Sequence, residues 1–211
     1  MSRQRKKEEK YERILQAAMD IITEKGIQRT TISEIANRAD VAQGTFYLYF
    51  SSKNALVPAM AERLVTITLN NLKEKVCRTS DFWTSLQQYI DEVYSMTEQH
   101  REILIICYAG AAFDYTMAMW EHIYSSYYEW FGHLLQTAID SGMIEADTNV
   151  EWTAKLLINM VEGEAERYYI GDDKETSAER SKEKLYEFIR RSLDPTYPFT
   201  DSLKEVLQES S

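Results

Sequence analysis

The segment from Thr30 to Lys53 constrains the fold of this chain more than any other stretch. Thr31 and Glu34 have the spacing of a capping box, in which the two side chains satisfy free amides at the start of a helix. The apolar residues that follow recur at helical spacings of three and four: Ile32, Ile35, Ala36 and Ala39. Asp40 then stands where a left-handed turn is expected, a conformation that Asp tolerates better than most residues. The pattern predicts a short amphipathic helix that ends in a tight turn.

The residues after this turn predict a second short helix, over about residues 42–49, that presents polar and aromatic side chains. Phe46 and Phe50 are expected to point inward, with Val41 filling the turn. The outward positions are expected to be Gln43, Gly44, Thr45, Tyr47 and Tyr49. Gln and Thr can bond base edges, Tyr can bond phosphates, and a glycine lets a helix approach DNA closely. We therefore predict a helix-turn-helix DNA-binding unit, because a hairpin in an ordinary helical bundle would not need exposed aromatics.

Lys53 follows two serines, Ser51 and Ser52, one of which is expected to cap the next helix. A cation in the first turn of a helix opposes the helix dipole. Such a cation is favourable where a phosphate binds the same helix N-terminus. Lys53 is therefore predicted to contact the DNA backbone.

Taken in order, these elements resemble the tetracycline-repressor (TetR) family of bacterial regulators. The matching motifs are the apolar stripe Tyr11, Ile14, Leu15, Ala18 and Ile22, then Gly26, residues 30–36 and residues 41–53. The resemblance covers about the first 65 residues, and the remainder matches only in length and helical character. It implies an all-α protein, with a three-helix DNA-binding head at 1–52 and a helical effector-binding and dimerisation domain at 53–211.

The resemblance also implies DNA contacts at Thr31, at the five outward positions of the second helix, and at Lys53 as a phosphate clamp. Two residues depart from the family pattern. Asp40 replaces the usual glycine, which keeps the turn but places a carboxylate near DNA. Pro58 is expected inside the fourth helix, where it would remove a backbone hydrogen bond and kink or loosen the first turns.

The charge of the chain is divided unevenly. The net charge is −10 over 211 residues, but residues 1–60 carry 10 Lys and Arg against 7 Asp and Glu. An acidic body repels DNA and leaves the mildly basic head to dock. Arg3, Arg5, Lys6 and Lys7 are expected to form a basic arm before the first helix, which either contacts DNA or is solvated.

A cytoplasmic protein is expected, without a membrane segment. The charged start lacks a signal-peptide pattern, and the longest apolar stretch, residues 103–112, is too short to span a bilayer. Two cysteines, Cys77 and Cys107, lack metal spacing and indicate free thiols in a reducing compartment.

The remaining chain predicts only helices, because glycine and proline are few and nothing alternates like a strand. The expected helices span residues 53–77, 82–98, 100–112, 115–141, 149–170 and 175–193, with a short last helix at 200–208. Paired reading helices must lie about 34–36 Å apart to meet successive DNA turns, so we expect a symmetric homodimer. The resemblance implies that the last two long helices form its seam, although the same faces could serve as internal core. The candidate residues are Trp152, Leu156, Met160, Gly163, Leu185 and Ile189.

Aromatic residues crowd the middle of the body and could line an inner cavity for an apolar ligand. The candidates are Tyr89, Tyr108, Phe113, Trp120, Tyr124 and Tyr127. Aromatics beside many carboxylates would also suit an apolar cation, but an acidic surface accounts equally well for the carboxylates. Core packing is the other explanation for each aromatic residue.

The sequence shows no catalytic, metal or cofactor motif, so we do not expect an enzyme. The leading hypothesis is a homodimeric repressor that a small apolar or cationic-apolar ligand releases from a palindromic operator on double-stranded DNA. An effector-independent DNA-binding regulator controlled by a protein partner is the alternative. A helical protein whose head has lost DNA binding is a third hypothesis, which the intact Gln43, Gly44, Thr45 and Lys53 disfavour.

Overall fold

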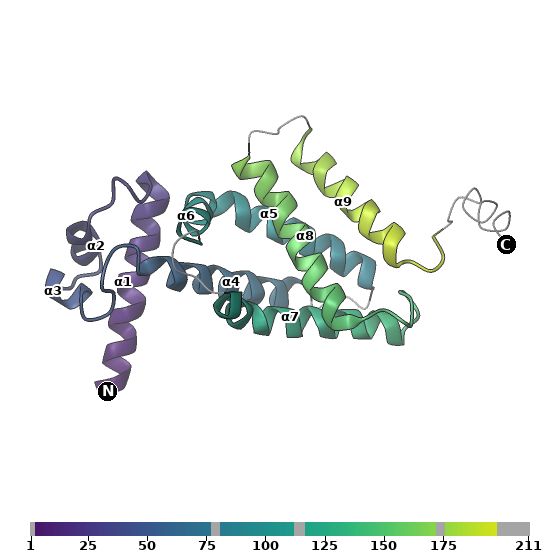
Figure 1. Cartoon of the computed structure of the whole chain (residues 1–211), viewed down its shortest axis with the longest axis horizontal. Helices are drawn as coiled ribbons and strands as arrows, with labels where there is room; N and C mark the ends of the chain where they lie inside the picture. The colour runs from purple at the N-terminus through teal and green to yellow at the C-terminus, as the bar shows by residue number, and fades with distance from the viewer. Residues whose placement is uncertain (1–2, 77–80, 112–116, 172–175, 198–211) are drawn as a thin grey trace.

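The computed structural model describes residues 3–76, 81–111, 117–171 and 176–197, which form nine helices and no strand. A small head of three helices lies at one end, and the long helix α4 runs from it into a larger helical body (Figure 1). The prediction of an all-α chain with an N-terminal head is confirmed.

The head consists of α1 (Arg3–Lys25), α2 (Ile32–Arg38) and α3 (Gln43–Phe46). Helix α1 buries Ile14, Ala18 and Ile22 completely, as its apolar stripe predicts. The expected basic arm is wrong as a separate element, because α1 already begins at Arg3. Its first turns are joined by a side-chain pair one turn apart, between Arg5 and Glu9 at 3.4 Å.

The turn between α2 and α3 has the predicted left-handed residue, since Asp40 has a φ of 51°. The amide of Val41 donates to the carbonyl of Ala36 at 2.9 Å, which closes the turn behind α2. Helix α3 is shorter than predicted, since residues 47–49 continue as turns rather than as helix.

Helix α4 (Leu56–Val76) begins three residues later than predicted. Pro58 is therefore its third residue, in the turn whose amides have no partner inside a helix. The missing N–H of Pro58 removes no hydrogen bond there. The expected kink is therefore wrong, because it assumed that Pro58 lies in the interior of the helix.

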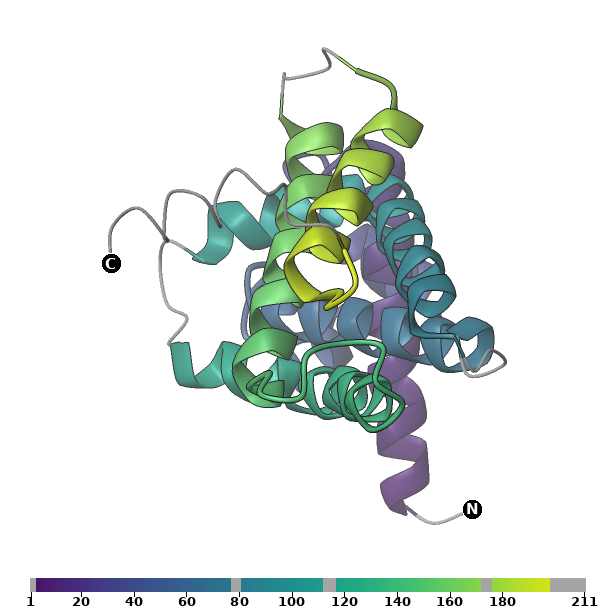
Figure 2. The same cartoon turned by 90° about the vertical axis from the view of Figure 1, so that its right-hand side faces the viewer.

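The body consists of α5 (Phe82–Gln99), α6 (Arg101–Ala111), α7 (Met117–Asp140), α8 (Val150–Ile170) and α9 (Ala178–Leu193). Each of these helices agrees with its predicted span to within three residues. Asp81, Asn149 and Ser177 cap three of them, each accepting from a backbone amide three residues on. Helices α8 and α9 lie side by side along one face of the body (Figure 2). The predicted helix at 200–208 lies outside the described residues.

The apolar residues form two cores rather than one. One fills the body between α4, α5, α7, α8 and α9. The other fills the head but extends beyond it, because it includes Leu56, Met60 and Leu64 of α4 and Ile103 and Ile106 of α6. Helices α4 and α6 therefore connect the head physically to the body.

Candidate functional sites

The N-terminus of α2 has the predicted capping box. The amide of Thr31 donates to Glu34 Oε2 at 2.9 Å, and the amide of Glu34 donates to Thr31 Oγ1 at 3.2 Å. Lys25 Nζ adds a hydrogen bond to Glu34 Oε1 at 2.5 Å. The hydrogen bond from Lys25, followed by those from Thr31, lowers the pKa of Glu34 to about 2. The carboxylate thus stays ionised and fixes the start of α2.

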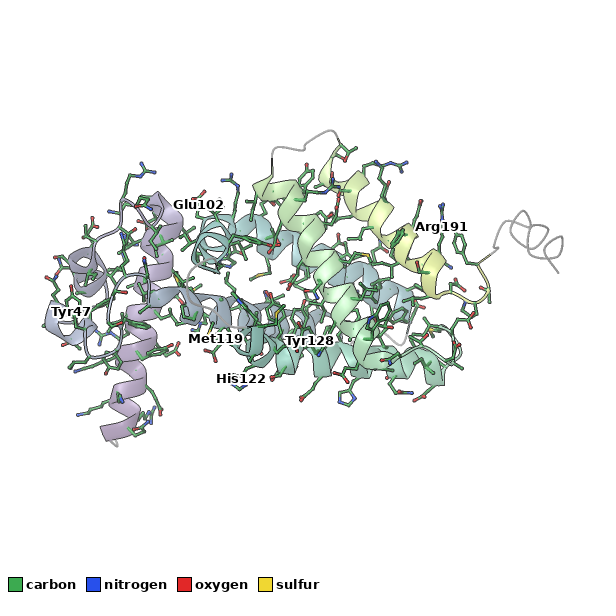
Figure 3. The ribbon with its side chains drawn as sticks, viewed as in Figure 1. Tyr47, Glu102, Met119, His122, Tyr128 and Arg191 are labelled. Carbon is green, nitrogen blue, oxygen red and sulfur yellow. The ribbon has the colours of Figure 1, made fainter. Side chains whose placement is uncertain are left out.

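The second helix of the unit presents polar side chains on the outer surface of the head. Phe46 is fully buried, whereas Gln43 and Gly44 are exposed and Tyr47 is 51% exposed. Tyr47 projects at the end of the head farthest from the body (Figure 3). A Cβ atom added at Gly44 would meet nothing within 4 Å, so no contact inside the chain requires this glycine.

Two neighbouring residues differ from their expected positions. Tyr49 is only partly exposed, because its ring packs 6.4 Å from that of Tyr11 on α1. Leu48 is 79% exposed, although it received no role from the sequence. Leu48 lies in the turn at residues 47–49 that follows α3.

Lys53 precedes α4 instead of lying in its first turn. Its Nζ donates to the carbonyl oxygens of Ile27 at 2.6 Å and Thr30 at 2.9 Å. These bonds connect the entrance of α4 to the loop before α2. An ammonium has three N–H donors, so one is left for another acceptor.

A second basic residue holds the turn of the helix-turn-helix. Arg13 on α1 donates through Nη2 to the carbonyl oxygens of Ala39 and Asp40, the latter at 2.8 Å. The same nitrogen lies 3.0 Å from Asp40 Oδ2. The carboxylate that replaces the family's glycine is therefore partly neutralised within the head.

The body contains a cavity with a volume of about 480 Å³ between α4, α5, α6, α7 and α8. Three predicted ligand residues line it: Tyr108, Trp120 and Tyr124. Tyr89 and Tyr127 are instead fully buried core residues outside the lining, and Phe113 lies outside the described residues. Cys107 also lines the cavity, and burial raises the pKa of its thiol to about 12.

The cavity wall includes two carboxyl groups of α8, Glu162 and Glu166, to which the sequence analysis assigned no role. Tyr124 Oη donates to Glu162 Oε2 at 3.0 Å, and Tyr108 Oη donates to Glu166 Oε2. Burial, followed by the charge of Glu166, raises the pKa of Glu162 to about 8. Burial also raises the pKa of Glu166. The spacing of four residues between Glu162 and Glu166 indicates that they share one side of α8. It does not indicate whether another helix covers that side.

The predicted dimer residues divide into two groups. Trp152 is 63% exposed and Leu156 40% exposed on α8, so both are free for a partner surface, and Met160 is partly exposed. Leu185 and Ile189 of α9 are buried in the body core, because they face α5 and α8 within the same chain. The exposed large apolar residue of α9 is Phe188.

Gly163 was predicted at the dimer seam, and within one chain a Cβ added there would meet nothing within 4 Å. It also lines the cavity. Across the described ranges, no helix is long and apolar enough to cross a membrane. The same part of the chain holds no group of three side chains suited to a metal ion.

Comparison with known proteins agrees with this architecture. Residues 14–60 match the bacterial regulatory proteins of the tetR family, and residues 86–193 match a tetracyclin repressor-like C-terminal domain. YvdT of Bacillus subtilis, named an uncharacterized HTH-type transcriptional regulator, is 47% identical over 184 residues, which cover 87% of this chain and 95% of YvdT. The chain belongs to the TetR family and is a DNA-binding transcriptional regulator.

Solved structures share the fold. The transcriptional regulator FadR of Bacillus subtilis, in complex with stearoyl-CoA, has a TM-score of 0.67 at 20% identity, covering 85% of this chain and 97% of FadR. RolR in complex with resorcinol has a TM-score of 0.68 at 16% identity, covering 90% of each chain. At these identities the likeness concerns the fold alone.

Proposed function

We propose that the protein is a homodimeric repressor that a small molecule in the body cavity releases from a palindromic operator. The observation that carries this proposal is the double role of α6. Ile103 and Ile106 belong to the head core, whereas Leu104 and Tyr108 line the cavity on the same helix. A ligand that displaces α6 therefore acts directly on the packing of the head.

Helix α4 provides the second connection. Ala61 and Leu64 belong to the head core and also line the cavity. A ligand that binds one arrangement of α4 and α6 better than the other shifts the population of the two. The shift changes the separation of the two heads, which must stay near one DNA turn to occupy adjacent major grooves.

DNA recognition is assigned to the outer surface of α3. Gln43, Thr45 and Tyr47 would contact bases and phosphates, and Gly44 would let the helix approach closely. Thr31 would contribute from the start of α2. Contacts of Tyr49 and Lys53 with the DNA backbone remain predictions. Both side chains have less freedom to reach a phosphate, because Tyr49 packs against Tyr11 and Lys53 bonds the carbonyl oxygen of Ile27.

Dimerisation is assigned to the exposed apolar side of α8 and α9. Trp152, Leu156 and Phe188 form unpaired apolar area in one chain, and a second copy would cover it. The complexes of FadR with stearoyl-CoA and RolR with resorcinol support a ligand-responsive body, because both proteins share this fold. The cavity favours this function over control by a protein partner alone.

The operator can be obtained by selecting bound duplexes from a random pool with the wild-type protein. We expect a palindrome bound by two copies, as measured by sedimentation of the complex. A protein that selects no sequence, or that binds as one copy, would contradict the proposal.

Coupling between cavity and head can be tested without knowing the effector. Gly163→Phe places a ring into the cavity, while Gly163→Ala adds only a methyl group at the same position. We expect operator affinity to change by about tenfold in the Phe variant relative to the Ala variant, which is within the usual range of allosteric coupling. Equal affinities would favour the effector-independent alternative.

A further inference from the structure

We propose that the cavity binds a lipophilic organic cation, with its positive group between Glu162, Glu166 and the aromatic side chains of α7. This inference rests on the proposed function only in taking the cavity as the effector site. The class of ligand follows from the charges and rings that line this chain's own cavity.

The described residues that line the cavity include acidic side chains but no basic one. Glu121, Glu162 and Glu166 are present, and no Lys, Arg or His lies among the described lining residues. Glu121 is paired with Lys155, whose Nζ lies 3.0 Å away. Glu162 and Glu166 have no basic partner in the described part of the chain, and their hydrogen bonds come from tyrosine hydroxyls.

The tyrosine hydroxyls orient these carboxyl groups but supply no positive charge. The raised pKa of Glu162 leaves it partly protonated near neutral pH, and a bound cation would favour its ionised form. Tyr124 binds one oxygen of Glu162, and Tyr108 binds one oxygen of Glu166. Because the two glutamates lie one helical turn apart on α8, their side chains lie on the same side of the helix and line the same region of the cavity. A carboxylate removed from water is unfavourable until a cation or enough donors compensate it. A bound cation would provide this compensation.

The aromatic wall provides the second half of the site. Trp120, Tyr124 and Tyr128 follow one another along α7, with neighbouring ring centroids 6.4 Å and 5.7 Å apart. All three line the cavity, and Tyr108 faces them from α6. Aromatic faces attract an organic cation, and more strongly where water is excluded. Quaternary ammonium groups suit such a wall because they shed water readily.

The rest of the cavity is apolar and would hold a hydrophobic portion of the ligand. Its lining there consists of Leu64, Val65, Val93, Met96 and Leu104. The volume of about 480 Å³ falls within the range of small-molecule sites. The same features disfavour anions, because a carboxylate or phosphate in this cavity would meet carboxyl groups, and Lys155, which lies over the ring of Tyr128, is already paired with Glu121.

A matched set of ligands tests the charge directly. Phenylbutyl-trimethylammonium would be compared with the neutral isostere in which carbon replaces the nitrogen, and with phenylhexanoate as the anion. Titration of the full-length protein, followed by tryptophan fluorescence and calorimetry, gives the three affinities. We expect the ammonium to bind at least about tenfold more tightly than its neutral isostere, as a desolvated cation–aromatic contact provides.

Variants assign that preference to the glutamates. Glu162→Gln and Glu166→Gln should reduce the preference for the ammonium by about tenfold each and leave the affinity of the neutral isostere unchanged. Glu129→Gln, on the exposed side of α7, is the matched control and should leave the preference intact. An ammonium that does not bind, or a preference that survives both cavity variants, would overturn the inference.

The proposed function can fail separately. In parallel, the three ligands would be added to the complex with the selected operator. If only the neutral isostere releases the DNA, the inference of a cationic ligand is wrong and the proposal of a ligand-released repressor stands. If the ammonium binds in a glutamate-dependent way but does not release the DNA, the inference of a cationic ligand stands and the proposal of ligand-released repression is wrong.

Discussion

Arg13 on α1 holds Asp40 in the turn between α2 and α3, with its Nη2 atom 2.8 Å from the carbonyl oxygen and 3.0 Å from Oδ2. The two residues are 27 positions apart in the sequence. Through this contact, the first helix of the head positions the turn of the helix-turn-helix unit. Since the Asp40 side chain is almost fully exposed, the charge pair itself adds little stability. The bonds to backbone carbonyls hold the turn.

Substitutions at Asp40 should separate backbone conformation from charge. We expect Asp40→Val to destabilise the protein by about 1–2 kcal/mol, because a β-branched residue resists the left-handed conformation. Asp40→Gly should change stability by less than about 1 kcal/mol. Urea denaturation of the full chain measures both. Equal losses in the two variants would mean that the carboxylate, and not the φ of 51°, determines stability here.

Loss of the outward side chains of α3 should remove sequence recognition without altering assembly. Gln43→Ala and Tyr47→Ala are each expected to weaken binding to the selected operator by about 1–3 kcal/mol, the usual value of a good base contact. Gel shifts with specific and scrambled duplexes measure the loss. Gln136→Ala, on the exposed side of α7, is the control. Wild-type operator binding by both α3 variants would show that α3 is not the reading helix.

Lys53 has two candidate roles with different signatures. If its third N–H contacts a phosphate, Lys53→Ala should weaken binding to all sequences and reduce the salt slope by about one unit. If it only bonds Ile27 and Thr30, the variant should lower thermal stability at an unchanged salt slope. Salt titrations and melting curves distinguish the two. We expect both changes, because the ammonium has donors for both.

Charges on the exposed apolar side of α8 should prevent dimerisation. The double variant Trp152→Glu with Leu156→Glu is expected to sediment at half the wild-type mass with unchanged helical circular dichroism. Leu185→Glu should unfold the body instead, because Leu185 is buried in the core. A double variant that stays dimeric would place the interface elsewhere.

Glu162 should make stability decrease toward alkaline pH. Its pKa of about 8 lies above the unfolded value, so the folded chain binds the extra proton and loses stability as pH rises from about 4 to about 8. Glu162→Gln removes this loss and should raise Tm by at least about 2 °C at pH 9, with a smaller gain at pH 5. The titratable groups that interact with it are Glu166 on α8, Tyr124, Tyr127 and Tyr128 on α7, Tyr108 on α6 and Tyr89 on α5. A gain independent of pH would contradict this assignment.

Local patterns were sufficient for the helices. The capping box at Thr31, the left-handed residue Asp40 and the apolar stripe of α1 depend on neighbours a few residues away, and the structure has them as predicted. Helix ends were less accurate. The start of α4 was predicted three residues too early, which moved Pro58 out of the first turn. The observed start at Leu56 follows the segment that Lys53 holds through the carbonyl oxygens of Ile27 and Thr30.

The sequence by itself therefore determined the class of fold, the helix-turn-helix unit and the separation of a basic head from an acidic body. Which face of each body helix is covered was decided only by tertiary packing. Glu162 and Glu166 lie on a polar stripe of α8 that resembles a solvated surface, yet both are partly buried in the wall of the cavity that α6 and α7 also line. Ile189 has the apolar spacing of a seam residue, but α5 and α8 bury it within one chain. Periodicity defines the faces of a helix, whereas burial depends on partners that are distant in sequence.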